Sequence, residues 1–254
     1  MRNIGLMLTK NDGRIIEEVL AKNARYIDTI YAIDGSTDSS PEIIKRHPKV
    51  KLLLLERDLK LKKPIWDDVL RQILLEEIKK KEGYGCWITE LHGDEIYYHD
   101  PRKVISAAEK EGADGVVWYA MHFFLHKTDK KNWNRLKLMS AEDRLTYYAI
   151  DKRPWKEFRQ FKFYDKSVYF LPRHSVTKPR GINHIFSKRP IYKHLKVYCP
   201  RQFEIFKGRW GGLYPKKSEG IFMSDMPFRG KYYRHTIKFD GSFGRWEKGL
   251  ESLR

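Results

Sequence analysis

Strand and helix patterns alternate through the first half of the chain, and this alternation limits the fold more than any other feature. Short apolar runs of strand length are separated by stretches with apolar residues at helical spacing. Strands are expected at 4–8, 29–33, 50–55, 86–91 and 116–124, and helices at 13–24, from Pro41, from about 65 to 82, and at 101–110. Strands that alternate with helices predict an α/β fold with a mainly parallel central sheet flanked by helices.

Local signals refine several of these elements. Asp12 is a candidate N-cap for the helix at 13–24, and Ser39 or Ser40 for the helix that begins at Pro41. The continuous apolar run at 50–55 predicts a strand covered on both faces. Cys86 is expected to be a small core residue, and neither cysteine has a zinc-like spacing.

The regular pattern ends near residue 125, and the rest of the chain reads as an irregular α+β elaboration. Residues 158–164 and 167–170 are expected to pair as strands, and 200–210 to form a short helix. Residues 1–125 are therefore interpreted as the α/β core, and 126–254 as a basic, aromatic-rich region continuous with it in one domain.

The net charge of +18 is concentrated in the C-terminal part of the chain. Residues 1–150 carry 26 basic and 24 acidic side chains, whereas 151–254 carry 25 and 9. Such a surface attracts nucleotide phosphates, anionic lipids, acidic glycans or nucleic acid, although a solvated basic face explains it equally well. No apolar run is long enough for an ordinary transmembrane helix, and the N-terminus lacks signal-peptide features, so a cytoplasmic or membrane-peripheral protein is expected.

Two of the expected strands end in acidic residues. The run 87–91 is followed by His92-Gly93-Asp94-Glu95, and the run 29–33 by Asp34-Gly35-Ser36-Thr37-Asp38. Carboxylates at the end of a buried strand are costly without a cationic partner, and open α/β sheets bind ligands at the carboxyl ends of their strands. The pair of acidic ends predicts a ligand crevice, with ordinary turn and helix-cap chemistry as the alternative, which is the better explanation for Asp38.

These motifs resemble those of the family 2 glycosyltransferases of GT-A fold, over roughly residues 1–125. The resemblance implies that Thr9, Lys10 and Asn11 line the nucleotide base and that Asp34 hydrogen-bonds the base or ribose. It also implies that Asp94, with Glu95 beside it, holds Mn²⁺ or Mg²⁺ against the donor diphosphate. His92 replaces the first aspartate of the family's motif, which leaves open whether it donates to a phosphate or ligates Mn²⁺, and how strictly the metal is needed.

The same resemblance implies an inverting displacement, in which one carboxylate deprotonates the acceptor hydroxyl. The candidates for that base are Asp143, Glu142 and Asp151, and His194 is a candidate late ligand for the metal or diphosphate. Basic side chains can also neutralise the diphosphate; the candidates are Lys178, Arg180, Lys193 and Arg201.

The expected partners are a nucleotide-sugar donor, UDP-linked, and a carbohydrate or lipid-linked acceptor, with peripheral contact to an anionic membrane. Two alternatives remain. One is a nucleic-acid or polyanion-binding protein, although the chain contains no recognisable nucleic-acid-binding motif. The other is a transferase that has lost turnover through the change at His92.

Overall fold

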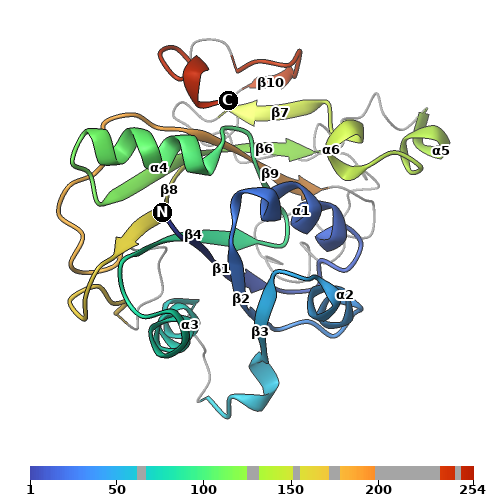
Figure 1. The fold of residues 1–254 in the computed structure, drawn as a ribbon. Coiled ribbons are helices and arrows are strands. Elements are labelled where there is room, and N and C mark those ends of the chain that lie inside the picture. The colour runs from blue at the N-terminus through green and yellow to red at the C-terminus, as the bar shows by residue number, and fades with distance from the viewer. Residues whose placement is uncertain (62–66, 125–131, 151–154, 172–177, 198–234, 244–246) are drawn as a thin grey trace. The chain divides into compact units, whose positions relative to one another are not determined.

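The computed structural model describes residues 1–254 except 62–66, 125–131, 151–154, 172–177, 198–234 and 244–246 (Figure 1). The described strands are β1 (Asn3–Thr9), β2 (Thr29–Asp34), β3 (Val50–Leu55), β4 (Cys86–His92), β5 (Glu95–Tyr97), β6 (Gly115–Phe124), β7 (Tyr147–Ile150), β8 (Trp155–Phe163), β9 (Ile191–Val197) and β10 (His235–Lys238). The described α-helices are α1 (Ile16–Asn23), α2 (Ser40–Arg46), α3 (Asp67–Glu82), α4 (Pro101–Lys110), α5 (Trp133–Leu136) and α6 (Ala141–Arg144).

The chain divides into two compact units, which are described separately. The first unit comprises Met1–Tyr119, Lys156–Tyr192 and Gly249–Arg254. The second comprises Ala120–Trp155 and Lys193–Lys248, so β6 and β9 each run through both.

The first unit confirms the α/β class, but its sheet is mixed. The order β4-β1-β2-β3 is parallel throughout, as the alternating pattern predicts. β8 then pairs antiparallel with β4, with Cys86 opposite Phe163 and Thr89 opposite Gln160. In the second unit, β6 pairs antiparallel with β7, and β7 with β10. The expected parallel arrangement is therefore correct for the first four strands, whereas the pairs β4–β8, β6–β7 and β7–β10 are antiparallel.

Helices cover both faces of the parallel strands because successive strand residues point to opposite sides. Ile88 packs in the apolar cluster that contains Leu74 and Ile78 of α3. The next residue back, Trp87, donates from its indole nitrogen to Glu109 of α4 at 3.2 Å. Figure 1 accordingly shows α3 and α4 on opposite sides of β4.

Three local expectations are wrong. β3 is only half-buried because it lies at the end of the strand order, where it has one neighbouring strand. Residues 167–170 do not pair with β8; instead, Tyr169 forms an isolated bridge with Arg180. Asp12 does not cap α1, whose N-cap is Ile15. The expected helix at 200–210 lies outside the described residues.

Other expectations are confirmed. β3 and α4 have the bounds expected for them, and α2 begins at Ser40 with Pro41 in its first turn. Cys86 is fully buried. Among the described helices, none is both long and apolar enough to cross a bilayer.

Candidate functional site

The candidate site lies where three parallel strands of the first unit end side by side. Thr9, the last residue of β1, is in register with Asp34 at the end of β2. On the other side of β1, Leu8 is in register with His92 at the end of β4. The two acidic strand ends predicted from the sequence therefore flank the end of β1, at one edge of the sheet.

The loops after β1 and β2 are bound to each other. Asn11, with a φ of 61°, adopts the left-handed conformation that asparagine tolerates well. Its backbone N–H donates to Ser36 Oγ at 2.6 Å, and its side-chain Oδ1 accepts from the Thr37 backbone N–H at 2.9 Å. This interlock holds the loop of Thr9, Lys10 and Asn11 against the loop that follows Asp34, and Thr9 itself is in register with Asp34.

Asp34 offers one carboxylate oxygen that is not used by the described protein. Its side chain is buried, and Oδ1 accepts from the Ser36 backbone N–H at 2.6 Å. Oδ2 has no hydrogen-bond partner among the described residues. Burial raises the pKa of this carboxyl group, because the charged form loses solvation. Asp38, in contrast, accepts from Gly13 and Ser40 backbone N–H groups, which confirms its interpretation as a structural residue at the helix start.

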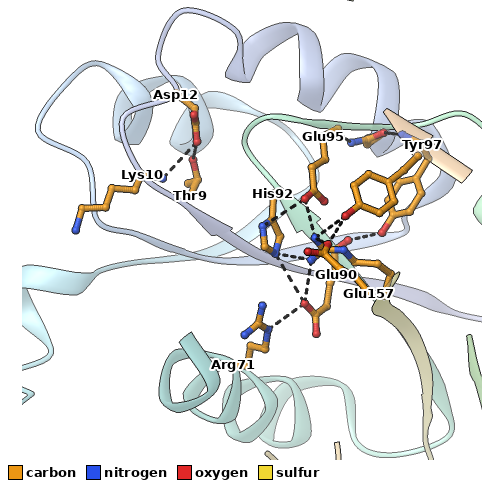
Figure 2. Close-up of polar contacts among 12 residues, drawn as sticks. Thr9, Lys10, Asp12, Arg71, Glu90, His92, Glu95, Tyr97 and Glu157 are labelled. Carbon is orange, nitrogen blue, oxygen red and sulfur yellow. Dashed lines mark hydrogen bonds and ion pairs between the residues drawn. The ribbon is translucent and has the colours of Figure 1, made fainter. Parts of the chain in front are cut away.

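Asp12, which the sequence pattern predicts as a helix cap, belongs to this site. Its Oδ2 accepts from Thr9 Oγ1 at 2.9 Å, so the carboxylate turns back toward the end of β1 (Figure 2). Burial first, and the charge of Asp94 second, raise the pKa of Asp12 to about 8. A Cβ atom on Gly93 would lie 2.3 Å from Asp12 Oδ2, so the β4 turn approaches Asp12 as closely as only glycine permits.

His92, Asp94 and Glu95 form a cluster that could hold a metal ion. Each offers one ligand atom, and these atoms lie within 4.8 Å of one another. Imidazole nitrogen with carboxylate oxygens suits Mn²⁺ better than Mg²⁺, which prefers oxygen alone. Burial raises the pKa of Glu95 well above its ordinary value, so this carboxyl group would gain from a nearby cation.

A buried arginine already contacts two members of that cluster. Arg159 of β8, 1% exposed, donates to Glu95 Oε1 at 2.6 Å and contacts His92 Nε2 at 2.7 Å. It also donates to Glu157 and to Tyr192 Oη. In Figure 2, the side chains of Glu90 and His92 from β4 and of Glu95 from β5 point toward one another.

A second buried arginine contacts Glu90 from helix α3. Arg71 of α3 donates to Glu90 Oε2 at 2.9 Å and to Asp68 Oδ1 at 3.0 Å. Burial alone would raise the pKa of Glu90, but its charged neighbours, Arg71 foremost, lower it to about 2. Glu90 is thus an ionised support for the site.

Sequence reasoning missed Arg71 and Arg159. A signal for Arg159 exists, because strand alternation places it on the same face as Phe161 and Phe163, both buried. A cationic residue on the same strand face as buried aromatic residues indicates a buried ion pair.

Two of the three expected catalytic bases belong to the second unit. Glu142 and Asp143 are in α6 of the second unit, and Asp151 lies outside the described residues. Glu142 accepts from Lys193 Nζ at 2.6 Å, and Asp143 exchanges hydrogen bonds with the N-cap residue Ser140.

His194 also lies in the second unit, where its ring centroid is 5.0 Å from that of His122. Of the basic candidates for the diphosphate, Lys178 and Arg180 are exposed in the first unit, and Lys193 is paired with Glu142 in the second. Arg201 lies outside the described residues.

Comparisons with known proteins leave the family open. No family model matches the chain, and no curated protein matches it. Among solved structures, the chain matches the crystal structure of A197 from STIV, at 15% identity over 76% of this chain and 81% of that one. The TM-score is 0.31, a likeness too low to support a conclusion about either fold or function. The site is therefore interpreted from its own geometry.

Proposed function

We propose that this protein is a glycosyltransferase that moves a sugar from a nucleotide-diphosphate donor to an acceptor hydroxyl by inverting displacement. The observation that carries the proposal is the shared edge of β1, β2 and β4. There, the interlocked loops around Asn11 and the unused oxygen of Asp34 lie next to the His92, Asp94 and Glu95 cluster. A nucleoside and a diphosphate, bound side by side, need these two kinds of group.

The chemistry explains why a cation belongs at this edge. When the glycosidic bond to the donor phosphate breaks, negative charge builds on the leaving diphosphate. A Mn²⁺ or Mg²⁺ ion held by Asp94 and Glu95 would supply the neutralising charge. Asp34 Oδ2 would accept from the base or ribose, and Thr9, Lys10 and Asn11 would line the nucleoside.

An inverting displacement also needs a carboxylate that takes the acceptor proton. Asp143, Glu142 and Asp151 remain the candidates for this role. Of these, Glu142 already forms an ion pair with the ammonium group of Lys193 at 2.6 Å, which would have to open before Glu142 could take the proton.

The first test is nucleotide binding, measured by thermal shift and calorimetry with UDP, GDP, CDP and TDP, with and without Mn²⁺. One nucleotide, expected to be UDP, should stabilise the protein, and Mn²⁺ should strengthen the effect. Asp34→Asn should weaken nucleotide binding with or without Mn²⁺, whereas Asp94→Asn should abolish only the Mn²⁺-dependent gain.

Glu76→Gln is the matched control, because this carboxylate is half-exposed on α3 and should not affect binding. A protein that binds none of the four nucleotides would contradict the proposal. Binding to nucleic acid or other polyanions with a steep salt dependence would then favour the alternative function.

A second candidate, a transferase without turnover, is favoured by the contacts of Arg159 with His92 and Glu95. In these contacts, the guanidinium group of Arg159 occupies the place where a metal ion bound with the nucleotide would act. Nucleotide binding without release of sugar from any UDP-sugar, in the presence of Mn²⁺, would support this second candidate.

A further inference from the structure

We infer that Arg159 is a positioning residue that holds His92 in the tautomer with its proton on Nδ1, so that His92 donates a hydrogen bond to an anionic oxygen of the bound ligand. That the anion is a diphosphate rests on the proposed function, whereas the tautomer follows from the protein alone.

The contact between the two side chains fixes the direction of the hydrogen bond. Arg159 Nη1 lies 2.7 Å from His92 Nε2. A guanidinium group has five N–H donors, no acceptor and a permanent charge. The only carboxylate oxygen recorded near Nε2 among the described residues, Glu90 Oε2, is 3.8 Å away, beyond hydrogen-bond distance. Nε2 is therefore the acceptor from Arg159, and a neutral imidazole with an accepting Nε2 carries its proton on Nδ1.

Arg159 cannot readily turn away from this contact. Its guanidinium is buried and also donates to Glu95 Oε1 at 2.6 Å, to Glu157 and to Tyr192 Oη at 3.2 Å. Rotation would break several charge-assisted hydrogen bonds in a desolvated site, and each of these is worth more than a neutral one. The orientation of His92 is thus set by the core of the first unit.

The Nδ1–H group remains available to a ligand. The nearest carboxylate oxygen, Glu95 Oε1, is 3.7 Å away, beyond hydrogen-bond distance, and already accepts from Arg159. The imidazole is about a quarter exposed and adjoins Asp94 across Gly93. A phosphate oxygen bound at the cluster would therefore meet a donor at this point.

The same geometry limits the role of His92 toward a metal. Ligation through Nδ1 would need the lone pair there and would move the proton to Nε2. Two donors, Nε2–H and Nη1–H, would then face each other in a buried site, which is costly. A cation at this cluster would be held by the oxygens of Asp94 and Glu95, with His92 serving the anion beside it.

The direct test is ¹⁵N NMR of the histidine side chains in the full chain, with His92 assigned by its absence in His92→Gln. The expected spectrum shows a protonated Nδ1 and an unprotonated Nε2. A protonated Nε2, or a doubly protonated ring, at neutral pH would overturn the inference. In Arg159→Lys, which keeps the charge but loses the fork of donors, the tautomer preference should weaken.

A second measurement tests the donor role with inorganic pyrophosphate as the probe. His92→Ala should lower pyrophosphate affinity about tenfold, the loss expected for one hydrogen bond to a charged group. His92→Asn, whose amide N–H can replace Nδ1–H, should recover most of it, whereas His92→Gln should not. If all three variants bound pyrophosphate as tightly as the parent protein, the donor role would be overturned.

These two measurements separate the inference from the proposed function. Pyrophosphate binding that depends on His92, without binding of any nucleotide, would leave the inference standing and remove the transferase proposal. The reverse result, nucleotide binding indifferent to His92, would remove the inference alone.

Discussion

Asp12 shows how a single carboxyl group can record the electrostatic state of the whole site. It is buried, faces Asp94, and has a pKa raised to about 8. An acid with a pKa higher in the folded than in the unfolded state holds its proton more tightly when folded. It therefore favours the folded state at low pH, and this contribution is lost as the pH rises.

We predict that Asp12→Asn removes a pH-dependent loss of stability. In the unsubstituted protein, the loss should develop between about pH 4 and pH 8, the interval between the two pKa values. The asparagine variant is uncharged throughout, so its melting temperature should exceed that of the parent at pH 8 by on the order of 5 °C, with a smaller difference at pH 5.

The measurement is a melting curve at each pH in a chelating buffer. Asp58→Asn, at an exposed position after β3, is the control and should follow the parent curve. An Asp12→Asn profile parallel to that of the parent would show that Asp12 is ionised in the folded protein at pH 5.

At the scale of single residues, the sequence predicted the site residues that directly follow strands, but not those that reach the site from distant parts of the chain. Asp34, His92 and Asp94 were predictable because strand ends are visible as a change from apolar to polar residues. Arg159 reaches the same place only because β8 pairs with β4, a contact across about seventy residues of sequence that no local pattern encodes.

At the scale of elements, α3 is joined to β4 by buried charges as well as apolar packing. Arg71 lies between Asp68 on its own helix and Glu90 on the strand, and all three side chains are at most 2% exposed. The helical pattern predicted a helix from about 65 to 82, and α3 spans Asp67–Glu82, but the pattern gave no reason for charges on its buried side. Those charges are explained only by the strand that the helix covers.

We predict that Arg71→Leu lowers the free energy of unfolding by about 3–5 kcal/mol, because it removes the buried cation that pairs with both Asp68 and Glu90. Urea unfolding followed by circular dichroism measures this loss. The control, Lys79→Leu, breaks an exposed pair with Glu76 and should cost no more than ~1 kcal/mol. A loss in Arg71→Leu as small as in the control would show that water solvates these carboxylates.

At the scale of the whole molecule, the excess of basic residues is explained either by an anionic binding partner or by a basic surface exposed to solvent. The sequence placed this excess in 151–254, but many of these residues lie outside the described part of the chain. The described part adds a specific feature just after α5. Leu138 is 82% exposed and Met139 37%, and Arg135 and Lys137 beside them are also exposed. Exposed apolar side chains flanked by cations are typical of segments that enter the interface of an anionic membrane.

We predict that the protein sediments with vesicles that contain phosphatidylserine and not with pure phosphatidylcholine, and that salt weakens this binding. Substituting Leu138 and Met139 together by serine should lower vesicle affinity about tenfold or more, because burial of a leucine side chain contributes about 1.5–3 kcal/mol. Tyr169→Ser, at another exposed apolar position, is the matched control and should bind like the parent. If the double variant kept full affinity while salt still released the protein, the contact would be purely electrostatic, and the basic residues alone would account for it.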